Sequence, residues 1–323
     1  MKPKILVVGS LVMDLIVTTE RFCNAGETVI GNGFSTAPGG KGANQAVQAS
    51  RLGADVTMVG KVGNDDFGRN LINSACASGV NTDYIFITES APTAVGNVQI
   101  QKNEKGTENR IIVVPGANFE ITVEDVAFLE EKIADFDMVI MQHEIPQEVN
   151  LKVAEYAKAK GVPVMLNPAP SAEVPKELIS CLTYISPNEH EAEDIVGIKP
   201  EGDDAIDKAV AALHNMGVKN VLMTLGKAGC ALSDGLTIME SPSIDIAPVI
   251  DPTAAGDSFI GAFCTATAAG VSVNEALVFA NCTAGITVSR MGAQTSLPTF
   301  DEVMSAMKTK GFSVEPYNKI KGE

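Results

Sequence analysis

The sequence predicts an α/β fold built on a mainly parallel sheet, with a second, small β-sheet attached to it. Short apolar runs separated by helical patterns indicate the parallel sheet, because strands that alternate with helices are joined by right-handed crossovers. Two segments with alternating, more polar patterns indicate the small sheet. The chain of 323 residues is 45% hydrophobic and 20% charged, so it can bury an ample globular core.

The apolar runs give the expected order of the large sheet. The first, KILVVGS, is continuous, as in strands covered on both faces. Asp14 interrupts the apolar stretch and no small-residue cleavage site follows, which favours a buried strand over a signal peptide. Helical patterns separate most later runs, including one that Gly53 ends and one that Gly217 ends. Further strands are expected at 55–60, 137–142, 162–167, 183–188 and 220–226.

The small sheet is expected from residues 15–37 and 93–113. These segments carry the patterns DLIVTTERF, ETVIGNGF, AVGNVQIQKN and NRIIVV, which suit an antiparallel sheet with one wet face. We interpret them as one lid inserted twice into the larger domain. The large domain then comprises residues 1–14, 38–92 and 114–323.

Charge and cysteine content narrow the function classes. The net charge is −16 with a pI near 4.6, and no Lys/Arg cluster occurs, which argues against a nucleic-acid or anionic-membrane partner. Any phosphate must therefore be held by backbone amides, a metal ion, or one or two placed cations. The 6 cysteines form no C-x-x-C pair, and no apolar run is long enough for a membrane span. Reduced thiols and a cytoplasmic location are expected.

The stretch GGKGANQAV, from Gly39 to Val47, is the first candidate site. Its glycines allow close approach of the backbone to a ligand, Lys41 supplies a cation, and Asn44 brings an amide to the first helical turn. A simple glycine-rich turn into a helix explains the same residues about equally well.

Two strand ends carry polar residues suited to a nucleotide. In PNEHE, the side chains of Asn188 and Glu191 lie on one face of a first helical turn, where an amide and a carboxylate suit a hydrated Mg²⁺. Taken alone, this motif is better explained by Asn188 as an N-cap with Glu191 completing a capping box. In TLGKAG, Thr224, Gly226 and Gly229 offer a hydroxyl and close backbone to a phosphate or ribose. An ordinary strand-to-hairpin turn is the alternative there.

The stretch DPTAAGDSF, from Asp251 to Phe259, carries the most specific chemistry. The N–H groups of 254–256 at a helix start would form an anion hole, and small side chains leave it open. Asp257 would accept a proton from an attacking hydroxyl, since phosphoryl transfer depends mainly on positioning and charge stabilisation. Pro252 biases Asp251 toward extended geometry, which frees it for a cation site. The alternative is that one Asp caps the helix and the other is solvated.

Taken in order, these motifs resemble the ribokinase family of PfkB-type carbohydrate kinases over essentially the whole chain. GGKGANQAV looks like the family's N-terminal signature, PNEHE carries its N-x-x-E, and DPTAAGDSF resembles its C-terminal signature. The segments GETVIG, PGAN, NPAP and MGAQTS look like the ribokinase branch. The resemblance implies a ribokinase-like three-layer sandwich with a β lid, and ATP-dependent phosphorylation of the 5-hydroxyl of a pentose.

The resemblance also assigns residues. Asp257 matches the catalytic base, and Ala254, Ala255 and Gly256 match the anion hole. Sugar-binding positions are matched by Asp14, Gly40, Lys41, Asn44 and Glu144, and nucleotide positions by Asn188, Thr224, Gly226 and Asn281, with Glu191 supporting Mg²⁺. A monovalent-cation loop, for K⁺ or a similar activator, is matched by Asp251, Thr253, Thr287, Arg290, Gly292 and Ser296. A homodimer through the lid is expected, because exposed edge strands invite pairing.

The sequence departs from the family pattern at two positions. Val12 stands where ribokinases usually have Asn, so an amide for a sugar hydroxyl is replaced by an apolar side chain and 2-deoxyribose becomes an alternative substrate. Pro252 replaces the commoner threonine and leaves the cation loop's geometry open.

Three other functions compete with a pentose kinase. A nucleoside kinase belongs to the same superfamily, and a non-catalytic sugar-binding regulator would keep the fold. The intact Asp257 and its anion hole argue against a regulator. A dinucleotide-dependent dehydrogenase lacks support because no G-x-G-x-x-G follows the first strand.

Overall fold

The computed structural model describes residues 1–103, 106–200 and 204–322, and within them the large sheet has nine strands in the order β13-β12-β11-β10-β9-β8-β1-β4-β5. Neighbours from β5 to β11 pair in parallel, whereas β12 and β13 form an antiparallel edge. This confirms the predicted mainly parallel sheet. Its strands are β1 (Lys4–Val8), β4 (Asp55–Gly63), β5 (Asn81–Thr88), β8 (Met138–Gln142), β9 (Val164–Asn167), β10 (Tyr184–Ile185), β11 (Asn220–Thr224), β12 (Cys230–Ser233) and β13 (Ile238–Ser241).

Helices cover both faces of this sheet and give three layers. Alternate residues of β1 point into different cores: Ile5 and Val7 join one, Leu6 and Val8 the other, which is why the strand is apolar throughout. The first core is closed by α1 (Lys41–Arg51), α2 (Asp66–Ala77), α8 (Ala255–Ala268), α9 (Val273–Thr287) and α10 (Phe300–Thr309). The second is closed by α3 (Leu129–Lys132), α4 (Gln147–Lys160), α5 (Lys176–Ile179), α6 (Glu189–Val196) and α7 (Ala205–Asn215). Short 3₁₀ turns are η1 (Gly116–Glu120), η2 (Ile133–Asp135), η3 (Gly226–Ala228) and η4 (Glu315–Lys321).

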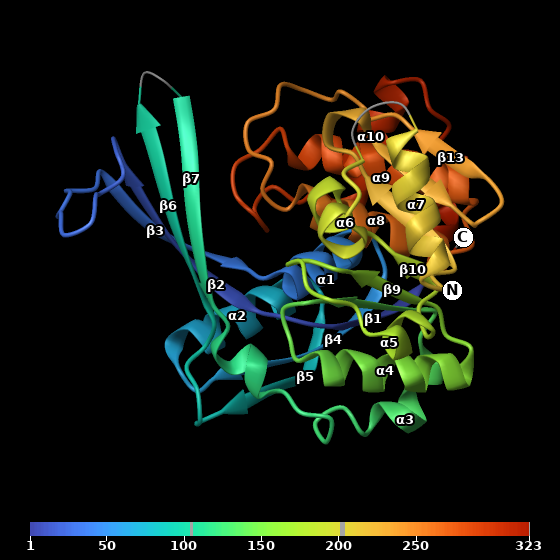
Figure 1. Ribbon diagram of the computed structural model, residues 1–323, viewed down its shortest axis with the longest axis horizontal. Helices are drawn as coiled ribbons and strands as arrows, with labels where there is room; N and C mark the ends of the chain where they lie inside the picture. The colour runs from blue at the N-terminus through green and yellow to red at the C-terminus, as the bar shows by residue number, and fades with distance from the viewer. Residues whose placement is uncertain (104–105, 201–203, 323) are drawn as a thin grey trace.

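A separate four-stranded sheet, the lid, stands away from the three layers, with its base beside α2 (Figure 1). Its order is β3-β2-β6-β7, from β2 (Val12–Thr19), β3 (Gly33–Gly39), β6 (Val95–Asn103) and β7 (Gly106–Val114). Both predicted segments therefore enter one sheet. The sheet is mixed rather than wholly antiparallel, because each segment forms its own antiparallel pair and the two pairs join through parallel β2 and β6.

One lid strand begins later than the sequence pattern indicates. A strand is expected from Glu27, but β3 starts at Gly33. The Glu27 carboxylate instead accepts hydrogen bonds from Arg21 and from the Asn24 N–H, and Gly26 adopts a left-handed φ of 76°. These contacts fold 24–27 into a turn, and pairing with β2 begins only where the Asn32 N–H donates to the Thr18 carbonyl at 2.8 Å.

The topology brings the candidate residues to one edge of the large sheet. The parallel strands β1, β8, β9 and β11 end there, and α1, α6 and α8 begin there (Figure 1). At this edge Gly40 passes close to other backbone: its φ is 92°, and a Cβ at this position would lie 2.8 Å from the Val12 nitrogen. Ligands in open α/β sheets bind at this edge. Across the described ranges, no helix has both the length and the apolar character needed to cross a bilayer.

Candidate active site

The acid at the start of α8 is buried and held by two amides. Asp257 is 7% exposed; its Oδ2 accepts from Asn44 Nδ2 and its Oδ1 from Gln45 Nε2, each at 2.9 Å. Both partners lie on the first turns of α1, more than two hundred residues earlier in the chain. The alternative that this Asp is solvated is therefore excluded.

The residues before Asp257 form a concave turn of peptide groups. Ala254 precedes α8 in the left-handed conformation, with φ 61° and ψ 12°, which is uncommon for a residue with a Cβ. Such a reversal points successive N–H groups to one side. A Cβ on Gly256 would meet nothing within 4 Å, so the space in front of this turn is open. Residues 254–257 all line one cavity. Within this turn the Ala255 N–H donates to the Pro252 carbonyl at 3.2 Å.

A second carboxylate, Glu144, lies across this end of the sheet. Its Oε2 accepts from Ser10 Oγ at 2.5 Å and from the Lys41 N–H at 3.0 Å. Burial, with the Glu144 carboxylate nearby, raises the pKa of Asp14 to about 6. Asp14 sits between the backbones of two glycines: a Cβ on Gly39 or Gly96 would come within 2.6 or 2.3 Å of its oxygens. The lid thus delivers one carboxylate to the large domain's edge.

The side chain of Lys41 is the cation of the site. Burial acts to lower its pKa, but the carboxylates of Asp257, Glu144 and Glu191 outweigh burial and raise it. Lys41 lines the same cavity as Asp257 and Glu191. A fixed positive charge therefore lies among three carboxylates, where it can balance an incoming anion.

Asn188 and Glu191 serve both as a helix cap and as cavity lining. Asn188 Oδ1 accepts from the Glu191 N–H and Glu191 Oε2 accepts from the Asn188 N–H, each at 2.9 Å, which completes a capping box on α6. Burial raises the pKa of Glu191. With Thr224, both residues line the cavity that holds Asp257. The two interpretations of this motif are thus compatible.

The turn after β11 lies beside this cavity. Gly226 and Gly229 have φ of 50° and 102°, and a Cβ on Gly229 would lie 2.2 Å from the Ser241 carbonyl oxygen. From α9, Asn281 Nδ2 donates to the same carbonyl at 3.1 Å. The turn is a β11–β12 hairpin, as the alternative interpretation expects, and neither glycine nor Asn281 lines the cavity.

The predicted cation loop is assembled from two chain segments. Asp251 accepts from the Thr253 hydroxyl at 2.6 Å and from the Gly292 N–H at 2.9 Å, and these contacts outweigh burial and lower its pKa. The Ile250 and Asp251 N–H groups donate to the Val288 carbonyl. Oxygen atoms of carboxylate, hydroxyl and peptide groups thus gather here, the donors that a hard cation prefers.

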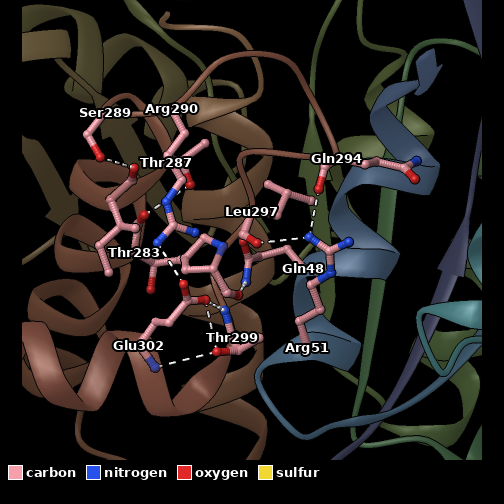
Figure 2. A network of polar contacts seen from close by, with 12 residues as sticks. Gln48, Arg51, Thr283, Thr287, Ser289, Arg290, Gln294, Leu297, Thr299 and Glu302 are labelled. Carbon is pink, nitrogen blue, oxygen red and sulfur yellow. Dashed lines mark hydrogen bonds and ion pairs between the residues drawn. The ribbon is translucent and has the colours of Figure 1, made fainter. Parts of the chain in front are cut away.

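Of the remaining residues of that set, Thr287 bonds back to α9 and Arg290 pairs with α10 (Figure 2), whereas Ser296 bonds within its own loop. The Thr287 hydroxyl donates to the Thr283 carbonyl, the Ser296 hydroxyl to the Ala293 carbonyl, and Arg290 pairs with Glu302 at 2.7 Å. From α1, Arg51 donates to the carbonyls of 294 and 297 at 2.6 and 2.8 Å (Figure 2). The Arg290 guanidinium is directed to α10 rather than to Asp251.

Sequence reasoning missed four polar side chains that support the site. Ser10 orients Glu144, and a chain of amides from Gln142 and Asn167 reaches Gln45 beside Asp257. Three of these carried a usable signal, because Ser10, Gln142 and Asn167 each end an apolar run at a strand's carboxyl end. Gln45 lies inside the glycine-rich motif, but nothing local distinguishes it from the next buried helical residue.

The comparisons with known proteins agree with this geometry. The sequence model described as pfkB family carbohydrate kinase matches residues 2–300. The chain is 42% identical over 299 residues to a ribokinase of Bacillus subtilis, covering 93% of this chain and 97% of that protein. It is 37% identical to a ribokinase of Lactococcus lactis over 94% of this chain and 97% of that one. It resembles the structure of Arabidopsis thaliana ribokinase complexed with ribose and ATP, with a TM-score of 0.88, 35% identity, and coverage of 95% and 99%. This chain belongs to the pfkB family of carbohydrate kinases and is an ATP-dependent sugar kinase.

Proposed function

We propose that this enzyme transfers the γ-phosphoryl group of ATP to the 5-hydroxyl of D-ribose, giving ribose 5-phosphate. The observation that carries the proposal is the placement of a buried carboxylate, Asp257, in one cavity with Lys41 and the concave turn 254–256. The relatives named ribokinase, and the neighbour complexed with ribose and ATP, support the choice of sugar and donor.

In this reaction Asp257 accepts the proton of the sugar hydroxyl as that oxygen forms its bond to the γ-phosphorus. The bond from phosphorus to the bridging oxygen breaks and ADP leaves. The peptide N–H groups of Ala254 and Gly256 face the charge that develops on the phosphoryl oxygens, and the long 3.2 Å bond of Ala255 can be exchanged for a ligand. Lys41 adds a fixed positive charge at the same place.

The sugar is held on the side of α1 that faces the lid. Asp14 and Glu144 accept hydrogen bonds from its hydroxyls, Asn44 donates one, and Gly40 keeps the backbone open. On the side of the cavity away from the lid, the nucleotide would bind along the turn after β11 and the neighbouring part of α9, at Thr224, Gly226, Gly229 and Asn281. Binding energy from both substrates is then used to align the hydroxyl with the phosphorus.

Two metal ions fit the oxygen donors of the site. Asn188 and Glu191 suit the water shell of Mg²⁺, which would neutralise phosphate charge when bound. For K⁺ the supporting observation is the joined pair of segments 250–253 and 287–296, with Asp251 at their junction. The proposed K⁺ site is completed by Thr253, Thr287, Arg290, Gly292 and Ser296. Arg290 would contribute its backbone, because its side chain pairs with Glu302.

A second candidate substrate is 2-deoxyribose, and Val12 is the observation that favours it. Val12 begins β2 two residues before Asp14, is only 4% exposed, and offers no hydrogen bond to a sugar hydroxyl. A site without that partner discriminates weakly between a hydroxyl and a hydrogen. We expect Val12→Asn to raise the ratio of kcat/KM for ribose to that for 2-deoxyribose about 10-fold or more. An unchanged ratio would remove Val12 from sugar selection.

We further propose a homodimer formed through the lid. Phe34 on β3 and Ile112 on β7 are 70% and 64% exposed, and the strand register places both on one face of the lid, an apolar surface on the two edge strands that suits a second copy. A cytoplasmic location fits the cysteines, all free in the described structure.

The test is release of ADP with ribose, 2-deoxyribose, fructose and nucleosides, with and without K⁺. Turnover on ribose that K⁺ increases is the expected result. Preferred turnover on a nucleoside would replace the sugar assignment. Tight ribose binding without ADP release would instead favour a non-catalytic regulator.

A further inference from the structure

Gln45 contacts the acid of the site from the side that ligands do not reach. Its Nε2 donates to Asp257 Oδ1 at 2.9 Å, and its side chain is 0% exposed. The other oxygen, Oδ2, accepts from Asn44, which is 6% exposed and belongs to the proposed sugar contacts. Gln45 does not line the cavity, whereas its partners Asp257 and Asn167 do, so its effect on the reaction passes through these neighbours, and the shorter contact is the one to Asp257.

The orientation of the Gln45 amide is fixed by what lies behind it. Gln142 Nε2 donates to Gln45 Oε1 at 2.7 Å, and Asn167 Oδ1 accepts from Gln45 Nε2 at 3.2 Å. Gln142 and Asn167 end the neighbouring strands β8 and β9 and are 0% and 7% exposed. A carboxylate only accepts, so the Gln45 nitrogen must face Asp257 and its oxygen must face the Gln142 donor. Each hydrogen bond in the series therefore has a fixed direction, from Gln142 to Gln45 and from Gln45 to Asp257.

Both supporting residues belong to strands of the central sheet, and further hydrogen bonds hold them. Asn167 Nδ2 donates to the Ser186 carbonyl just after β10 at 3.0 Å, and the backbone carbonyl of Gln142 accepts from Asn150 Nδ2 of α4 at 2.7 Å. The chain therefore connects the acid on α8 to two strands of the rigid central sheet rather than to a loop.

We propose that Gln45 is a positioning residue for phosphoryl transfer, which Gln142 orients, and that it fixes one oxygen of Asp257 so that the other faces the sugar hydroxyl. This inference rests on the proposed role of Asp257 as base. Hydrogen bonds to a charged acceptor are stronger than neutral ones, and in a buried site they prevent the carboxylate from rotating. Small losses of alignment between base and hydroxyl lower the rate steeply.

A neighbouring residue provides the matched control. Gln48 lies on the same helix, is also 0% exposed, and donates to the Pro298 carbonyl at 2.9 Å, without contacting Asp257 (Figure 2). Gln48→Met and Gln45→Met each remove one buried amide at nearly constant volume, with one hydrogen bond lost at Gln48 and three at Gln45. A purely structural role predicts that both variants lose stability and keep the same kcat.

The experiment measures kcat, KM for ribose, ribose binding by calorimetry, and melting temperature for each variant. For Gln45→Met we expect kcat to fall about 10- to 100-fold with ribose Kd changed less than about 3-fold. For Gln48→Met we expect kcat within about 2-fold of the parent, with a fall in melting temperature no larger than that of Gln45→Met. Gln45→Glu keeps the shape but places an acid against Asp257, and its kcat should be at least as low as that of Gln45→Met.

Gln142→Met removes the orienting donor and keeps Gln45, so it tests the chain even if Gln45→Met does not fold. We expect the kcat of Gln142→Met to fall about 3- to 10-fold. The double variant with Gln45→Met and Gln142→Met should be no slower than Gln45→Met alone, because both substitutions act through the one contact between Gln45 and Asp257. Equal kcat for the Gln45 and Gln48 variants, or additive losses in the double variant, would overturn the inference. If Asp257→Asn itself keeps its kcat, the proposed base is wrong, which is a different failure.

Discussion

The cavity at the start of α8 and the lid differ in how they treat polarity. Around Asp257 buried polar side chains donate hydrogen bonds to one another, with Gln45 and Gln142 both 0% exposed, and only the Asn44 and Gln142 side-chain oxygens of this described cluster lack a partner. In the lid the reverse holds, since apolar side chains such as Phe34 and Ile112 are 70% and 64% exposed. Buried polar groups are tolerated when hydrogen bonds satisfy them, whereas an exposed apolar surface calls for another surface to cover it.

This difference separates two tasks. The large domain holds the proposed base, the cation and the cap at α6 on rigid elements, each anchored to the central sheet. The lid contributes Asp14 and little else of chemical interest, and its sheet stands beside the body (Figure 1). Changes in the large domain should therefore affect the chemical step, and changes in the lid should affect sugar binding or assembly.

The largest effect should come from the acid at the base of the cavity. Asp257→Asn keeps the shape and both amide neighbours but removes the proton acceptor. We expect kcat to fall at least about 100-fold while ribose affinity stays within a few fold, the pattern of a transition-state role. Steady-state kinetics together with calorimetric binding separate the two quantities. A variant that mainly raises KM would show that the acid binds sugar and does not take the proton.

The next largest effect should follow loss of the cavity's cation. Lys41→Met keeps most of the length of the side chain and removes the charge that three carboxylates surround. We expect ribose binding to weaken about 10-fold or more, because Asp257, Glu144 and Glu191 are then left without a counter-charge. Circular dichroism should be unchanged. Full affinity in the variant would place Lys41 outside the sugar site.

A smaller effect is expected from pH, through the lid's carboxylate. With its pKa raised to about 6, Asp14 takes up a proton as the pH falls through that value and loses an acceptor for a sugar hydroxyl. We expect KM for ribose to rise severalfold between about pH 7.5 and pH 5, with a smaller change in kcat. Asp14→Asn should flatten this dependence. A KM profile that is the same in parent and variant would assign the titration to another group.

The same shift has a consequence for stability. Because the folded-state pKa of Asp14 lies above its ordinary value of 3.8, the folded protein holds this proton more tightly than the unfolded chain. The resulting stabilisation is fully present below the ordinary value and is lost as pH rises through about 6. Relative to the parent, Asp14→Asn should therefore gain melting temperature at about pH 8 and much less at about pH 4.

The smallest effect on catalysis should come from the outer edge of the lid. Ile112→Lys places a charge in the exposed apolar surface and should shift sedimentation from dimer to monomer, with kcat within about 3-fold of the parent. Leu236→Lys, at a 91% exposed position between β12 and β13, is the matched control and should leave assembly unchanged. A dimer that survives Ile112→Lys would move the interface elsewhere.

Much of the site could be predicted because its motifs are local. GGKGANQAV, PNEHE and DPTAAGDSF each lie at one strand–helix junction, and their short spacing fixes which residues share a turn. The capping box of Asn188 and Glu191 and the small residues before α8 follow from such spacing alone. The late start of β3 could not be predicted from spacing, because the hydrogen bonds of Glu27 form a turn within a segment whose alternating pattern looks regular.

What the sequence determined by itself was the order of strands and helices, the class of fold, and which polar residues fall at strand ends, since these depend on periodicity and on local turn chemistry. The tertiary structure alone decided which of those ends meet. Ser10 reaches Glu144 across 134 residues of chain, and Gln45 reaches Asp257 across 212. Such contacts arise from the stacking of α1 and α8 on one sheet, and no local pattern encodes which oxygen of a carboxylate an amide will hold.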